Sequence, residues 1–223
     1  MSTKSVQPKN IDTRDRILDA AEELFVEHGF AATSLRAIAT RADVNLAATN
    51  YHFGSKMGLL GSVFHRHIFP VNEERLKRLK ALERSERSLT LNEILEALFL
   101  PLIEGLPHER LPALMGRIFS EPESITKPII EKEFAEVAAR FQAAIVKVLP
   151  DLPIEILRWR FHLMIGSMIH MLKFQSPIGS EYSRDMFTKG IEELINYSVA
   201  GLSRGQNLQG NPDQQVNHQE ISK

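Results

Sequence analysis

Apolar side chains recur along most of the chain at the three- and four-residue spacing of amphipathic helices. Beyond residue 88, no stretch has the pattern of a convincing strand. The apolar stripes predict helices over 13–29, 34–42, a short segment from about 46, 56–68, 89–104, 111–119, 128–149, 154–174 and 183–203. We therefore predict an all-α fold.

Residues that start or stop helices mark several of these boundaries. Asp12 is expected to cap the first helix, and Gly29 to end it in the way C-terminal glycines do. The helix from residue 56 can be interrupted near Pro70, and Pro128 is expected to open the helix that follows it. Charges of both signs over 73–87 indicate either a solvated helix or a connector between two units.

The most informative stretch is 33–56, where two short helices surround a tight turn and exposed polar and aromatic residues follow. Thr33 or Ser34 can cap the first of these helices, and Asn45 can cap the second. Small side chains such as Ala47 would let the second helix approach a groove closely. This is how a helix-turn-helix DNA reader is built, with the N-terminal residues of the second helix at the base edges.

Several residues of this stretch have a second interpretation. Tyr51 and Phe53 can be core residues that tie the short helices together. His52 can bind a phosphate or serve as a partner at the helix end, and Arg36 and Arg41 can be ordinary solvated charges. The spacing of the whole segment favours the DNA-binding interpretation.

Residues 12 to 68 resemble the DNA-binding domain of TetR-type repressors. The resemblance rests on Leu24-Phe25-Val26-Glu27-His28-Gly29-Phe30, Thr33-Ser34, Tyr51-His52-Phe53, Ser55-Lys56 and Leu59-Leu60. It implies a DNA interface that contains Ser34, Arg36, Asn45, Leu46, Ala47, Asn50, Tyr51, His52 and Lys56, to which we add Thr33 as the neighbour of Ser34.

Two positions depart from the pattern of the family. Asn50 stands where many members have an aromatic residue, and asparagine can pair with adenine in the major groove. Asp43 stands where glycine is usual, although aspartate also tolerates a left-handed backbone.

The helices of residues 69–204 look like the second domain of that family, which binds a ligand and dimerises. The same resemblance implies a homodimer that forms through the last two helices as a four-helix contact. Residues 152–166 look like a subgroup of regulators that respond to long-chain fatty acids or their CoA esters. A flexible arm is expected over 1–11 and a disordered tail over 205–223.

Large, deformable apolar side chains are more numerous in this region than a plain bundle needs, although each can equally be an ordinary core residue. The candidate pocket residues are Phe99, Met115, Phe119, Phe134, Phe141, Trp159, His162 and Met168. His162 and His170 are about 12 Å apart along one helix, too far to hold one metal ion together. We expect packed or hydrogen-bonded histidines, or contacts to a ligand head group or a partner subunit, and no metal.

The composition of the 223-residue chain excludes several classes of function. The chain has no cysteine, which excludes disulfides and thiolate chemistry, and it lacks the common motifs of hydrolases, zinc proteases and nucleotide-binding enzymes. We therefore expect neither an enzyme nor a cofactor. The net charge is only −1, but between residues 34 and 66 the basic residues Arg36, Arg41, Lys56 and Arg66 stand against Asp43 alone. No apolar run is long enough for a membrane span, and a cytoplasmic location is expected.

We predict a ligand-responsive transcriptional regulator of the TetR type, acting as a repressor. A dimer would bind a palindromic double-stranded operator and be released by a small hydrophobic effector, such as a fatty acid or acyl-CoA. The alternative is a TetR-like DNA-binding protein without a small-molecule effector.

Overall fold

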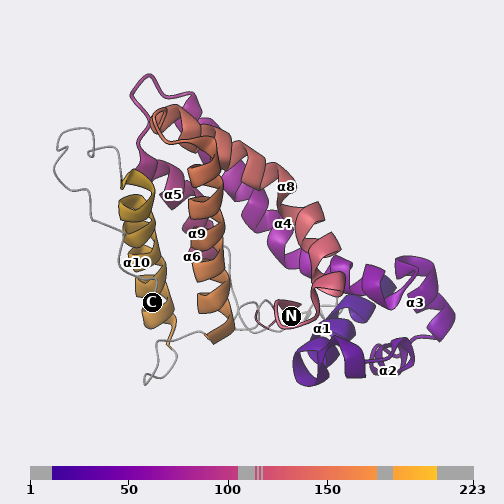
Figure 1. The fold of residues 1–223 in the computed structure, drawn as a ribbon. Coiled ribbons are helices and arrows are strands. Elements are labelled where there is room, and N and C mark those ends of the chain that lie inside the picture. Colours follow the sequence, from indigo (N-terminus) through magenta and orange to yellow (C-terminus); the bar gives the residue numbers. More distant parts are fainter. Residues whose placement is uncertain (1–11, 105–113, 115, 117, 175–182, 205–223) are drawn as a thin grey trace, which may run out of the picture. The chain divides into compact units, whose positions relative to one another are not determined.

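The computed structural model describes residues 12–104, 114, 116, 118–174 and 183–204. Every regular element within those ranges is a helix, which confirms the all-α prediction (Figure 1). The helices are α1 (Thr13–Ala32), α2 (Leu35–Arg41), α3 (Leu46–Phe53), α4 (Lys56–Glu83), α5 (Leu91–Phe99), α6 (Pro101–Glu104), α8 (Glu123–Val148), α9 (Ile154–Phe174) and α10 (Arg184–Ser203). The helix predicted over 111–119 lies mostly outside the described residues, as do the predicted arm and tail.

The chain divides into two compact units. Among the described residues, the first unit contains 12–73, 114, 116, 118–135 and 172–174, and the second contains 74–104, 136–171 and 183–204. The predicted domain division between residues 68 and 69 stays a prediction.

Proline has less effect on the helices than its chemistry suggests at two positions. α4 continues through Pro70, because the buried Ile68, Val71 and Leu79 extend its apolar stripe and offset the lost backbone hydrogen bond. α8 begins at Glu123, so the expectation that Pro128 opens this helix is wrong. A proline this close to the start of a helix removes only one backbone bond, which the rest of α8 compensates.

A third proline does interrupt a predicted helix. The segment predicted as one helix over 89–104 is divided at Leu100 into α5 and α6, because Pro101 has no N–H to continue the ladder of α5. Thr90 caps α5 and forms a capping box with Glu93.

The core of the first unit forms from the stripes that the sequence predicts. α1 buries Ile17, Leu18, Ala21, Leu24 and Phe25, and α4 adds Leu59, Leu60, Val63 and Phe64. Gly29 has φ 82°, which ends the regular part of α1 as predicted. Asp12 precedes α1, but its side chain makes no capping hydrogen bond.

In the second unit, α9 and α10 lie antiparallel. Arg160 near the start of α9 donates a hydrogen bond to the carbonyl of Leu202 at the end of α10, at 2.8 Å. In the single chain, α9 has one buried face and one exposed apolar face. Its inner face buries Leu157, Phe161, Met164, Met168 and Leu172, whereas Trp159 and Leu163 on another face are 66% and 64% exposed. None of the helices in the described ranges combines the length and apolar character needed to cross a bilayer.

Candidate nucleic-acid interface

α2 begins with a side-chain cap that leaves a hydrogen-bond donor available. Ser34 Oγ accepts a hydrogen bond from the backbone N–H of Ala37 at 3.1 Å, so its hydroxyl hydrogen can still be donated to a phosphate. Arg36, the second residue of α2, is exposed. Ile38 and Ala39 are buried, and they fix the inner face of α2 against the rest of the unit.

The turn between α2 and α3 uses the left-handed backbone that the sequence analysis anticipated. Asp43 has φ 53°, a conformation that aspartate tolerates better than most residues. The N–H of Val44 donates to the carbonyl of Ala39 at 3.0 Å, which closes the turn against α2. α3 therefore starts at a defined angle to α2.

α3 repeats the capping arrangement of α2. Asn45 Oδ1 accepts a hydrogen bond from the N–H of Ala48 at 2.8 Å, and the amide NH₂ of Asn45 is left to donate. Leu46, Ala47 and Asn50 are exposed, so the first five residues of α3 present a leucine, a small alanine and a polar amide to the solvent. A helix start with these properties can enter a major groove.

The aromatic residues at the end of α3 differ in their exposure to solvent. Tyr51 is 86% exposed, so the interpretation of this residue as part of the core is wrong. Its ring makes an edge-on contact with His52, which is also exposed, at 5.3 Å between centroids. Phe53 is half-buried, and the guanidinium of Arg14 lies 5.5 Å from its ring centre.

Two residues of the predicted interface point inward. Thr33 is buried, and its hydroxyl donates to the carbonyls of Gly29 at 2.8 Å and Leu24 at 3.1 Å, beside the kink at Gly29. The ammonium of Lys56 also faces backbone carbonyls of the same segment. Both side chains stabilise the connection between α1 and α2.

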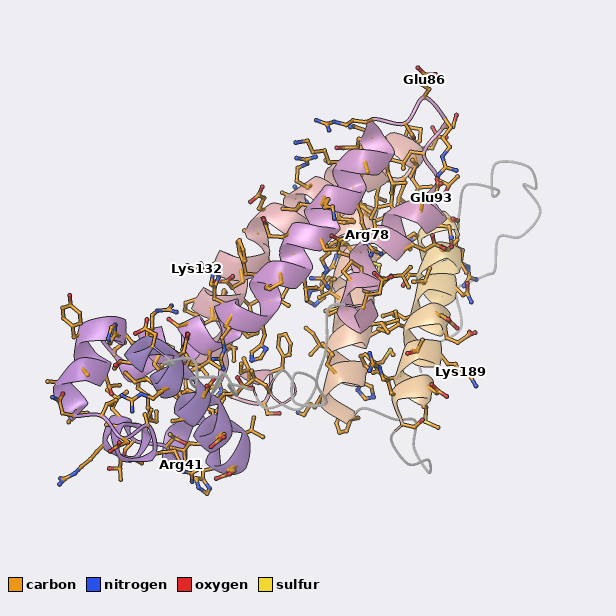
Figure 2. The ribbon with its side chains drawn as sticks, turned by 180° about the vertical axis from the view of Figure 1, so that it is seen from behind. Arg41, Arg78, Glu86, Glu93, Lys132 and Lys189 are labelled. Atoms are coloured by element: carbon orange, nitrogen blue, oxygen red, sulfur yellow. The ribbon has the colours of Figure 1, made fainter. Side chains whose placement is uncertain are left out.

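The basic residues counted between 34 and 66 are mostly occupied within the protein. Arg41, labelled in Figure 2, pairs with Glu23 at 3.0 Å, and Arg66 pairs with Asp19 at 2.6 Å and with Glu22. The count overlooked the acidic residues of α1, which lie outside the window. The positive field of this unit therefore depends on fewer side chains than the sequence suggests.

Glu22 anchors α4 to α1. Its carboxylate is 5% exposed and lies 2.7 Å from Nε2 of His67, and it also pairs with Arg66. Burial raises the pKa of Glu22, but hydrogen bonds and charge from His67 and Arg66 outweigh this effect and hold the pKa below its usual value.

A lowered pKa in the folded state means that Glu22 stabilises the fold above its unfolded-state pKa, and that this contribution is lost as the pH falls through the folded-state pKa. We expect Glu22→Gln to lower the free energy of unfolding by about 1–3 kcal/mol at pH 7 and by much less below about pH 4. Urea denaturation across this pH range measures the effect. Glu23→Gln, which breaks an exposed pair with Arg41, is the control and should cost less than about 1 kcal/mol. Equal costs for the two variants would contradict the assignment.

Thr49 is buried on the inner side of α3, and among the described residues its hydroxyl has no hydrogen-bond partner. We expect Thr49→Val to leave stability unchanged or raise it by up to about 1 kcal/mol, because valine removes an unsatisfied buried group. Thr33→Val is the matched control, since it deletes a hydroxyl that has two carbonyl partners, and should cost about 1–2 kcal/mol. Thermal or urea unfolding of both variants checks the prediction, and a larger loss for Thr49→Val would overturn it.

The predicted pocket residues are distributed over both units. Phe119 and Phe134 lie in the first unit, where the ring of Phe134 is 6.0 Å from that of Phe64. The members of the second unit are Phe99, Phe141, Trp159, His162 and Met168, and Met115 lies outside the described residues.

Of the predicted pocket residues in the second unit, Phe99, Phe141 and Met168 are buried, whereas Trp159 and His162 are exposed on α9. This unit contains a cavity of about 490 Å³, but none of the predicted pocket residues lines it. Its lining includes Arg78, Leu82, Arg87, Glu93 and Leu100, of which Arg78 and Glu93 are labelled in Figure 2. The pocket therefore stays a prediction.

The two histidines of α9 are exposed as well. Their exposure rules out packing in the core of the single chain, because the buried face of α9 passes through residues 157, 161, 164 and 168 instead. Contact of these histidines with a ligand head group or a partner subunit stays a prediction. Among the described residues, no three histidine, aspartate or glutamate side chains are grouped closely enough to hold a metal ion.

Comparison with known proteins agrees with these features. Residues 17–63 match the family described as bacterial regulatory proteins, tetR family, and residues 96–201 match the tetracyclin repressor-like C-terminal domain. A probable HTH-type transcriptional regulator of Bacillus subtilis, YttP, is 46% identical over 50 residues, which are 22% of this chain. That alignment spans 24% of the length of YttP.

Solved structures extend the likeness over most of the chain. The fatty acid degradation regulator FadR from Bacillus halodurans has a TM-score of 0.65 at 15% identity, covering 88% of this chain and 99% of FadR. SmeT in complex with triclosan has a TM-score of 0.62 at 23% identity, covering 84% of this chain and 90% of SmeT. At these identities the structures show a shared fold.

The capped α2–turn–α3 segment and the helical second unit define a helix-turn-helix regulator with a separate all-α C-terminal region. The chain belongs to the TetR family of transcriptional regulators. The family and the matched relative are regulators of transcription and not enzymes.

Proposed function

We propose that the protein binds a palindromic DNA operator as a homodimer and represses transcription until a small hydrophobic effector binds. The observation that carries the proposal is the exposed, capped start of α3, where Asn45, Asn50 and Tyr51 project from a helix held by its buried face. Ser34 and Arg36 of α2 add donors suited to phosphates beside it.

The second unit supports the homodimer through an exposed apolar face on its last two helices. Trp159 and Leu163 lie on α9, and Tyr197, which is 70% exposed, lies on α10. Gly166 and Gly201 continue the same two faces, and open space surrounds the position where each would carry a Cβ. Helical glycine costs about 1 kcal/mol relative to alanine, and nothing in the single chain explains it here. Close approach of a second copy accounts for both glycines.

The proposed effector is a small hydrophobic molecule. Residues 152–166 suggest a fatty acid or acyl-CoA, and the shared folds of FadR and of SmeT in its triclosan complex are compatible with a small apolar ligand. By linkage, a ligand that weakens DNA binding must itself bind more weakly to the DNA-bound protein by the same factor.

Gel-shift binding to the DNA upstream of the protein's own gene, in moderate salt and with a panel of fatty acids and acyl-CoAs, tests the proposal. Specific binding that one lipid releases would support both the DNA-binding function and the lipid effector. Specific binding that no lipid alters would remove the lipid effector and keep the DNA-binding regulator. A transcription reporter with the bound site would then separate repression from activation.

A further inference from the structure

The backbone N–H and the backbone carbonyl of Phe30 are each held by a charged side chain. Its N–H donates to Glu121 Oε1 at 3.0 Å, and its carbonyl accepts from Nζ of Lys56 at 2.8 Å. All three residues belong to the first unit. Phe30 directly follows the Gly29 kink that ends the regular part of α1, so these contacts act where the backbone would otherwise lack helical partners.

The ammonium group of Lys56 donates its hydrogen bonds to backbone carbonyls of residues 30–33. Besides Phe30, its ammonium contacts the carbonyls of Thr33 at 2.9 Å and Ala31 at 3.5 Å, and it lies 4.3 Å from the centre of the Phe30 ring. An ammonium has three N–H donors, so these carbonyls occupy the group that a phosphate contact would need. Cation–π attraction to the ring adds to the same placement.

Lys56 lies only three residues after the end of α3, the second helix of the helix-turn-helix, which we call the reading helix. α3 ends at Phe53, the N–H of Gly54 donates to the carbonyl of Asn50 at 2.8 Å, and α4 starts at Lys56. The side chain of Lys56 thus connects the end of α3 to residues 30–33, which lead directly into α2. Glu121 accepts a hydrogen bond from the N–H of Phe30, the residue whose carbonyl accepts from Lys56.

We propose that Lys56 and Glu121 are positioning residues that clamp the backbone of Phe30 and thereby set the relative placement of α2 and α3, and that neither contacts DNA. The proposal rests on the DNA-binding function proposed above. It replaces the phosphate contact that the family resemblance implies for Lys56 with a role inside the protein.

The first test asks whether removing the negative charge of Glu121 strengthens or weakens operator binding. Removing an acidic residue ordinarily strengthens DNA binding by reducing repulsion from phosphates. We expect Glu121→Ala to weaken specific operator binding about fivefold instead, and Glu121→Gln, which keeps an acceptor oxygen, to restore most of the affinity. Binding of Glu121→Ala that equals or exceeds that of the wild type would overturn the proposal.

The second test is the salt dependence of operator binding by Lys56→Met, with Lys80→Met on the same helix as the charge-matched control. A lost phosphate contact in each subunit would lower the slope of log K against log salt by about 1.8, since each phosphate contributes about 0.9. The clamp predicts weaker binding with a slope equal to that of Lys80→Met. A slope reduced by the full amount, or unchanged affinity of the folded variant, would contradict the clamp.

Circular dichroism and sedimentation establish that each variant is folded and dimeric. If Lys56→Met does not fold, the Glu121 variants decide the outcome. Hydrogen exchange of the DNA-free protein gives a readout that does not depend on the operator: Glu121→Ala should raise exchange over residues 29–41 and leave the centre of α4 unchanged. Unaltered exchange there would overturn the clamp, whereas a wild type without specific DNA binding would overturn only the proposed function.

Discussion

Tyr51→Ala is expected to weaken operator binding by roughly 30-fold, which corresponds to about 1 kcal/mol lost in each of the two subunits of the proposed dimer. The side chain is 86% exposed, and its ring makes an edge-on contact with that of the neighbouring His52, so its removal takes little packing from the fold. The loss should therefore appear in DNA affinity and not in thermal stability.

Fluorescence anisotropy with a labelled operator and with a scrambled duplex measures this effect. Tyr51→Phe is the matched control: it keeps the ring and separates stacking or packing from a hydrogen bond of the hydroxyl. Sedimentation should show an unchanged oligomer. A variant that binds the operator normally would remove Tyr51 from the interface, and one that unfolds would mean that the residue has a structural role.

Leu163→Glu is expected to dissociate the proposed dimer and to weaken operator binding by about 100-fold, because the two half-sites would then be bound independently. Leu163 is 64% exposed on α9, on the face that also carries Trp159 and Gly166. A carboxylate buried there in a dimer would lack a partner, whereas the single chain would keep it in water.

Analytical ultracentrifugation measures the dissociation. Val146→Glu on α8 is the matched control, since it places the same charge at another exposed apolar position, and it should remain dimeric. Gly166→Leu offers an independent route, because the open space beside it leaves the fold of the single chain unaffected while a closely packed partner helix would be displaced. If Leu163→Glu and Val146→Glu behave alike, the dimer does not form through this face.

Local sequence patterns predicted the helices well wherever one short segment holds the necessary information. α9 and α10 have the predicted limits to within a residue, and Ser34, Asn45 and Ser183 cap the helices that follow them. The errors arose at Pro70, Pro101 and Pro128. There the effect of proline depends on the packing of the whole helix and on its position within it, which a residue type alone does not reveal.

The side-chain partners were less predictable than the helices. The sequence indicated a helix-turn-helix because caps, turn residues and apolar spacing act over a few neighbouring positions. It did not indicate that Arg66 pairs with Glu22, that Lys56 faces the carbonyl of Phe30, or that Glu121 accepts from the N–H of the same residue. The last two contacts join residues 26 and 91 positions apart. Such contacts form only when distant segments pack together, so the tertiary structure alone decided which charged side chains are free to meet DNA and which hold the reading helices in place.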